Sequence, residues 1–60
     1  MRYYKLNHDG TLIRVENDQQ QKYMPDRGWV HTRILDQYPH TEIKQATAEK
    51  KIRAIQKSRQ

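Results

Sequence analysis

Aromatic, aliphatic and β-branched residues cluster in two short runs at the start of the chain and predict a β-hairpin. The runs cover residues 3–6 and 12–15 and flank the pair Asp9-Gly10. A pair of this kind tolerates the positive φ angles that tight hairpin turns require. We therefore expect a hairpin over about residues 2–16.

Turn length sets the register of this hairpin, because a slip of one residue exchanges its two faces. We prefer a two-residue turn at Asp9-Gly10, which gathers four apolar side chains on one face. They are Tyr4, Leu6, Ile13 and Val15. A four-residue loop over 7–10 keeps the same faces. A three-residue loop with Gly10 as a left-handed bulge would instead set Leu6 opposite Leu12.

The second face of the predicted hairpin combines two apolar and two cationic side chains. These are Tyr3, Lys5, Leu12 and Arg14. Mild repulsion between the cations favours solvent or a contact surface on this side, so we expect an exposed contact patch. For the aromatic residues in general we prefer the simpler account, in which Trp29, Tyr4 and Tyr23 serve as core in a chain without Phe, and an outward-facing Tyr3 is the functional alternative.

The middle of the chain predicts one further strand and one ambiguous segment. Residues 20–24 suit a strand that closes at the turn-forming residues 25–28. Residues 29–38 have apolar spacings that fit a short helix, which we prefer. The alternative is a strand from Trp29 to Arg33 that pairs back on Tyr23.

The C-terminal segment predicts a helix with two different faces. Ala48, Ile52 and Ile55 form a narrow apolar stripe, whereas Ile43 would fall on the opposite side of the same helix. A break resolves this conflict: residues 42–44 run extended, Thr47 caps, and the helix covers about 47–58. Opposite the stripe lies a cationic set that consists of Lys50, Arg53 and Lys57.

Together these elements predict a single small α+β domain over residues 1–60. An antiparallel β-meander, the hairpin plus one or two further strands, packs against the C-terminal helix. We expect the Ala48/Ile52/Ile55 stripe to pack on the hairpin face that contains Leu6 and Ile13. A chain of 60 residues removes only about 60% of its unfolded surface from water, so the stability of this domain should be small.

Charge changes this picture by marking the last third of the chain. The net charge is +5, and residues 41–60 carry six Lys or Arg against two Asp or Glu, whereas residues 1–40 carry six against five. Such asymmetry is typical of contacts with nucleic acid, an acidic protein or an anionic membrane. A solvated helix face is the simpler explanation.

The composition argues against several classes of function. There is no Cys, no signal-peptide core and no apolar run long enough to span a bilayer, so we expect a soluble, cytoplasmic protein without membrane contact. The three His residues show no metal spacing, and no catalytic set forms around the single Ser58. We therefore expect no metal, no cofactor and no enzymatic activity.

The layout of the chain resembles that of short uncharacterised proteins of Firmicutes and their phages. The residues that carry the resemblance are Tyr3-Tyr4-Lys5-Leu6, Gly10, Leu12, Arg14-Val15, Trp29, Thr41-Glu42-Ile43, Ala48 and Ile52. The resemblance implies no established activity.

Two functional hypotheses follow from these patterns. The first is a protein-binding or self-associating module, including a phage-type regulator or inhibitor of a host protein, because the apolar residues are few and lie on both faces of the hairpin. It implies an unidentified protein partner or a homo-oligomer. The second is a basic nucleic-acid-binding accessory protein that places Lys50, Arg53 and Lys57 on phosphates.

Overall fold

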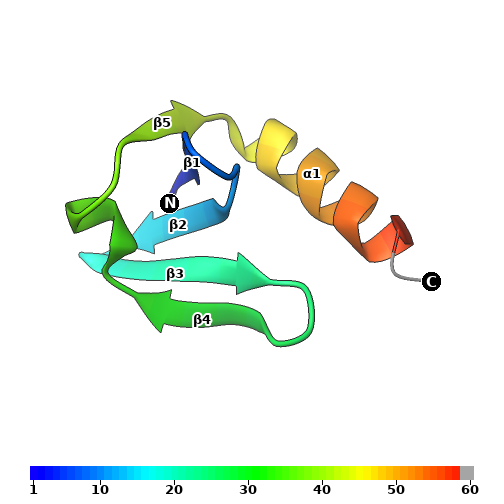
Figure 1. Cartoon of the computed structure of the whole chain (residues 1–60), viewed down its shortest axis with the longest axis horizontal. Helices are drawn as coiled ribbons and strands as arrows, with labels where there is room; N and C mark the ends of the chain where they lie inside the picture. The colour runs from blue at the N-terminus through cyan, green and yellow to red at the C-terminus, as the bar shows by residue number, and fades with distance from the viewer. Residues whose placement is uncertain (59–60) are drawn as a thin grey trace.

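The computed structural model describes residues 1–58 and shows an α+β fold, a five-stranded antiparallel sheet with one C-terminal helix (Figure 1). The strands are β1 (Arg2–Leu6), β2 (Leu12–Glu16), β3 (Gln19–Met24), β4 (Gly28–Thr32) and β5 (His40–Ile43). Their order is β4-β3-β2-β1-β5, a meander whose last strand returns to pair with the first. A short 3-10 helix, η1 (Ile34–Asp36), precedes β5, and α1 (Gln45–Ser58) follows it. The predicted α+β meander is confirmed, with three strands beyond the hairpin rather than one or two.

The turn between β1 and β2 is a four-residue loop, so the preferred two-residue turn was wrong. Tyr4 lies opposite Ile13, and the Gly10 amide donates to the Leu6 carbonyl at 2.8 Å. The side chain of Asp9 stabilises the longer loop, because its Oδ1 accepts the Thr11 amide at 2.9 Å. The two faces of the hairpin are nevertheless those expected from the sequence, since both loop lengths have the same parity.

The two-residue turn with positive φ angles lies instead between β2 and β3. Its residues are Asn17, with φ of 51°, and Asp18, with φ of 65°, and they place Gln19 opposite Glu16. Both central residues of a type I′ turn need positive φ, which Asn and Asp tolerate better than most residues. The strand predicted over 20–24 is therefore confirmed and begins at Gln19.

The ambiguous segment 29–38 begins as a strand, to Thr32, and continues into a 3-10 helix over Ile34–Asp36, so the preferred α-helix was wrong. Trp29 pairs with Tyr23 in the β3–β4 ladder, as the alternative required. The strand ends where the Thr32 hydroxyl accepts the Ile34 amide at 3.2 Å and the chain enters η1. Cross-strand packing on the sheet thus outweighed the helical spacing of the apolar residues.

The predicted break before the C-terminal helix is confirmed. Residues 40–43 form β5 on the free side of β1, and α1 begins two residues after Ile43. Thr47 does not cap this helix as expected, because the helix already begins at Gln45 and the Ala48 amide donates to the Lys44 carbonyl at 3.0 Å. Within residues 1–58, no helix is both long and apolar enough to cross a membrane.

Helix α1 covers one face of the sheet, which we call the helix face. The strand registers place on this face, among others, Tyr3, Lys5, Leu12, Arg14, Tyr23, Trp29 and Ile43. Gln56 of α1 donates to the Tyr23 hydroxyl at 3.3 Å, and Ile55 lines a hollow together with Leu12. Burial of Ala48 on α1, which is 0% exposed, marks the helix side of this contact.

The opposite face of the sheet, which we call the η face, is covered by the segment around η1. It contains Tyr4, Leu6, Ile13, Val15, Gln20 and Val30. The Gln20 side chain holds this cover in place, because its Oε1 accepts the Leu35 amide and its Nε2 donates to Asp36, both at 3.2 Å. Ile13, on this face, is 0% exposed.

The expected docking of α1 on the Leu6 and Ile13 face was therefore wrong. The apolar stripe of α1 lies over the helix face, and Leu6 and Ile13 are buried on the other side of the sheet. The direction in which the chain leaves β5 decides this outcome, and hydrophobic periodicity alone does not contain that direction. Apolar residues on both hairpin faces reflect a sheet that is covered on both sides.

Candidate functional site

The cationic set of α1 forms an exposed stripe, which we call the cationic stripe. It consists of Lys50, Arg53 and Lys57, and the structure leaves all three side chains exposed. At 100° per residue these positions lie within about 60° of one another, on the side of α1 away from buried Ala48. Docking of the helix through its apolar stripe is thus what turns the cations to the surface.

The electrostatic surroundings of the cationic stripe leave its charge available. The only ion pair within residues 1–58 joins His8 and Asp9, in the hairpin loop. Glu49 is the one carboxylate of α1, and its Oε1 accepts the Gln45 side-chain amide at 3.2 Å. Residues 44–58 therefore form a surface with five Lys or Arg residues and one Glu.

The predicted hairpin patch, Tyr3, Lys5, Leu12 and Arg14, is not an exposed contact surface. Tyr3 is 9% exposed and Leu12 is 3% exposed, because α1 covers the helix face. In Figure 1, α1 leaves β5, passes the β1–β2 turn and then projects beyond the sheet. Tyr3 and Leu12 are therefore part of the core, Lys5 and Arg14 are half-buried, and the burial of Tyr3 argues against stacking of bases or of a partner on it.

Arg14 has a structural environment of its own on the helix face. Its guanidinium carbon lies 4.4 Å from the centroid of the Trp29 ring, and its Nε donates to Gln21 at 2.6 Å. Tyr3 and Tyr23 meet the same indole edge-on, with ring centroids 6.4 and 5.3 Å away. Such stacking satisfies a half-buried cation without an acidic partner. Arg14 is thus a packing residue, and Lys5 beside it is half-buried.

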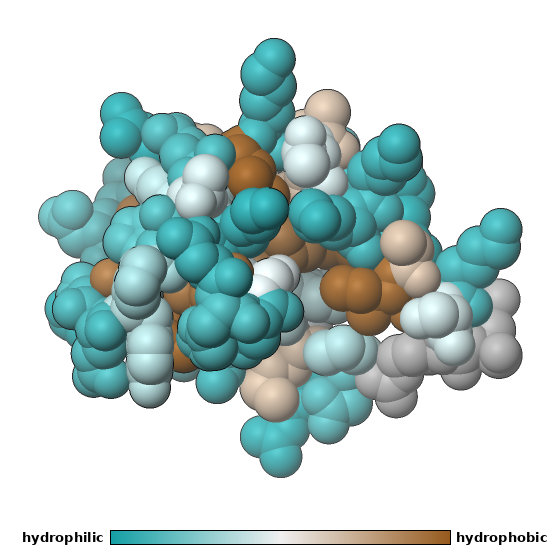
Figure 2. Space-filling view, turned by 45° about the horizontal axis from the view of Figure 1, so that its top comes forward, coloured by the Kyte–Doolittle hydropathy of each residue, from teal (hydrophilic) through white to brown (hydrophobic). Residues whose placement is uncertain are grey.

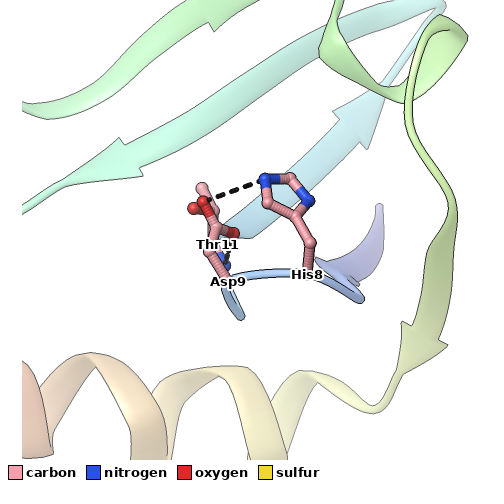
Figure 3. A network of polar contacts seen from close by, with 3 residues as sticks. All are labelled: His8, Asp9 and Thr11. Carbon is pink, nitrogen blue, oxygen red and sulfur yellow. Dashed lines mark hydrogen bonds and ion pairs between the residues drawn. The ribbon is translucent and has the colours of Figure 1, made fainter.

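The hairpin loop holds the polar cluster that most resembles a catalytic pair (Figure 3). His8 Nε2 lies 3.4 Å from Asp9 Oδ2, with the two side chains 54% and 49% exposed. The backbone amide and hydroxyl of Thr11 and the nearby His8 lower the pKa of Asp9 below its ordinary value. An exposed carboxylate with a lowered pKa is a poor proton donor near neutral pH. The role that the geometry supports is structural, because the hydrogen bond from the Thr11 amide to Asp9 stabilises the loop.

A shallow groove opens between α1 and the β1–β2 loop. Its volume is about 350 Å³, and it is lined by Asp9, Gly10, Leu12, Lys51, Ala54 and Ile55. Figure 2 shows apolar residues partly open between the sheet and the protruding helix, with hydrophilic residues around them. The sequence analysis missed this groove because it placed Leu12 on a free surface and gave Ala54 no role. In the sequence, Ile55 at the end of the predicted apolar stripe was the residue that could have indicated the groove.

The described residues, 1–58, contain no group of three or more His, Cys, Asp or Glu side chains suited to a metal ion. His8 stacks near Tyr38 and His40 near Tyr4, both with ring centroids 5.2 Å apart. Comparison of the chain with protein-family models, with curated proteins and with solved structures gives no match. The surface geometry is therefore the basis for any functional conclusion.

Proposed function

We propose that the protein is a non-enzymatic nucleic-acid-binding accessory protein that contacts phosphates through the cationic stripe. One observation carries the proposal: of the two surfaces expected from the sequence, the hairpin patch has its apolar members Tyr3 and Leu12 buried, whereas all three side chains of the cationic stripe are exposed. This reverses the order of the two hypotheses, because the first relied on an outward-facing hairpin. The proposal takes the protein to act in the cytoplasm.

The physical basis of binding is release of the counterions condensed on a polyanion. Lys50 and Lys57 are seven residues apart on α1, which corresponds to about 10.5 Å along the helix axis. Three cations on one helix side can therefore follow a phosphate backbone. The stripe offers charge and no side chains arranged to read base edges, so we expect binding without sequence specificity.

The test is the salt dependence of affinity for a duplex and for a single strand, measured by fluorescence anisotropy. With three phosphate contacts, the logarithm of the affinity should fall with the logarithm of the salt concentration with a slope of about −2.7 for duplex DNA and about −2.1 for a single strand. Replacing Lys50, Arg53 and Lys57 together by Gln should remove most of this slope.

A matched control removes the same charge elsewhere. Arg2, Arg27 and Arg33 are exposed and lie outside the basic surface of residues 44–58, so their joint replacement by Gln lowers the net charge equally. We expect the control to keep most of the salt slope. Equal losses in the two triple variants, or an affinity that does not change with salt, would contradict the proposal.

A second proposal, a protein-binding or self-associating module, rests on a different observation. The groove between α1 and the β1–β2 loop leaves Ile55 and Ala54 open beside Leu12, and the sheet has an unpaired edge strand. A phage-type regulator or inhibitor of a host protein would belong to this class. Capture of a protein that survives nuclease treatment would support this proposal over nucleic-acid binding.

A further inference from the structure

The sheet has two edges, and they differ in how well they are protected against pairing with another chain. Edge strand β5 is four residues long, follows Pro39, contains Glu42 and is followed by Lys44. Short length, charge and proline are the usual devices that block edge pairing. Edge strand β4 is one residue longer, and its sequence Gly-Trp-Val-His-Thr contains no Pro, Lys, Arg, Asp or Glu, so its only charged neighbours in the sequence are Arg27 and Arg33, outside the strand.

The outer edge of β4 is also uncovered. Its only backbone hydrogen bonds among residues 1–58 are those of the ladder with β3, from Met24↔Gly28 to Gln20↔Thr32. In an antiparallel ladder, alternate residues point their N–H and C=O groups away from the paired strand. Figure 1 shows β4 at the border of the sheet with no element beyond it. This edge therefore presents free backbone donors and acceptors in a segment of high β-propensity.

We propose that the protein forms a homodimer in which β4 pairs antiparallel with β4 of a second copy, which gives one continuous ten-stranded sheet. One register pairs all five residues of the strand. It sets Val30 opposite Val30 of the second copy on the η face, Trp29 opposite His31 on the helix face, and Gly28 opposite Thr32. Every pair is aromatic, β-branched or small, and none places like charges directly opposite each other within the strand.

The charges that flank β4 give this dimer a salt dependence. Arg27 and Arg33 are exposed and bracket the strand, so the proposed register places Arg27 of one copy near Arg33 of the other at both ends. Each chain also carries a net charge of +5. Salt screens both repulsions, so dimerisation should strengthen as ionic strength rises. Binding to a polyanion weakens as salt rises, so failure of one proposal can be distinguished from failure of the other.

Because directly opposite residues share a face, this pairing puts both α1 helices on the same side of the ten-stranded sheet. The interface is the edge of β4 together with the half-buried side chains of Trp29 and Val30. The β4 strands of the two copies run in opposite directions, so the arrangement closes with two-fold symmetry and leaves the β5 edges outermost.

The test uses the absence of Cys in the natural sequence. Val30→Cys places two thiols across the proposed two-fold axis, with Cα atoms about 4.5 to 5.5 Å apart, which is within disulfide range. Thr32→Cys is the matched control on the same strand and face. Its thiols would be four residues out of register, about 13 Å apart, and beyond disulfide reach.

After oxidation at high salt and separation on a non-reducing gel, we expect at least tenfold more covalent dimer from Val30→Cys than from Thr32→Cys. Sedimentation of the wild-type protein should show a doubling of mass with concentration that Val30→Lys abolishes and Val30→Thr retains. Far-ultraviolet circular dichroism confirms that each variant is folded. Equal crosslinking of the two Cys variants, or a wild-type monomer at millimolar concentration in high salt, would overturn the proposal.

Discussion

The two faces of the sheet are covered by elements of different kinds, and the difference explains which residues hold the fold together. On the η face, where Gln20 holds the 3-10 turn by hydrogen bonds, Leu6 and Ile13 are almost wholly buried. On the helix face, α1 buries Ala48 beside Tyr3 and Leu12 but leaves Ile52 and Ile55 half-exposed. The smaller cover thus makes the tighter core, and the longer element leaves surface for binding.

The largest expected effect follows truncation on the η face. Ile13→Ala removes a side chain that is 0% exposed and should lower the free energy of unfolding by about 2 to 5 kcal/mol. A single core of this size rarely supplies more than about 3 to 5 kcal/mol, so much of the chain should be unfolded. Urea unfolding measures the loss.

Val15→Ala is the control for this substitution, because Val15 lies on the same strand and face but is only half-buried. It should cost clearly less than Ile13→Ala. If the two substitutions cost the same, the η face would not contain the tighter core, and the comparison of the two faces would fail.

The next effect sharpens the comparison within α1. Ile52→Ala removes a half-buried side chain from the apolar stripe and should lower the free energy of unfolding by about 1 to 2 kcal/mol, less than a fully buried site. Arg53→Ala, on the cationic stripe, should change it by no more than about 0.5 kcal/mol. Thermal or urea unfolding compares them, and an equal or larger loss from Arg53→Ala would mean that the cationic side of α1 is docked.

The sequence predicts much of the local structure and little of how its elements meet. The hairpin, the break between Ile43 and the helix, and the side of α1 that contains Lys50 all follow from short-range patterns, because periods of 2 and 3.6 residues are local properties. Asn17-Asp18 is also a pair that tolerates positive φ angles, which both residues adopt. Asp9-Gly10 is the stronger turn signal in the sequence, and for this reason the two-residue turn was predicted at the wrong place.

Which face α1 covers depended on information that local patterns do not contain. In the sequence, the hairpin face with Leu6 and Ile13 is the more apolar one, because the face with Tyr3 and Leu12 also carries two cations. Only the return of β5 to the free side of β1 sends the following helix across the less apolar face. The candidate site changed with that one choice, because a helix on the helix face buries the hairpin patch and leaves the cationic stripe as the exposed basic surface.

The smallest expected effect concerns how a cation is accommodated on the helix face. Arg14→Met keeps the length and the apolar stem of the side chain but removes the charge over Trp29 and the hydrogen bond to Gln21. A cation–π contact that is partly exposed stabilises by about 0.5 to 1 kcal/mol, so the free energy of unfolding should fall by about that amount. Lys5→Met is the matched control, because Lys5 is half-buried on the same face, with no aromatic contact among those within residues 1–58.

Trp29 is the only Trp in the chain, so its fluorescence reports the contact between Arg14 and the indole ring directly. Its emission should shift in Arg14→Met and stay unchanged in Lys5→Met, because only the first substitution alters what lies over the indole ring. Equal stability and equal emission in the two variants would mean that the contact with Trp29 does not stabilise Arg14. The helix face would then lack the charged contact that distinguishes it from the η face.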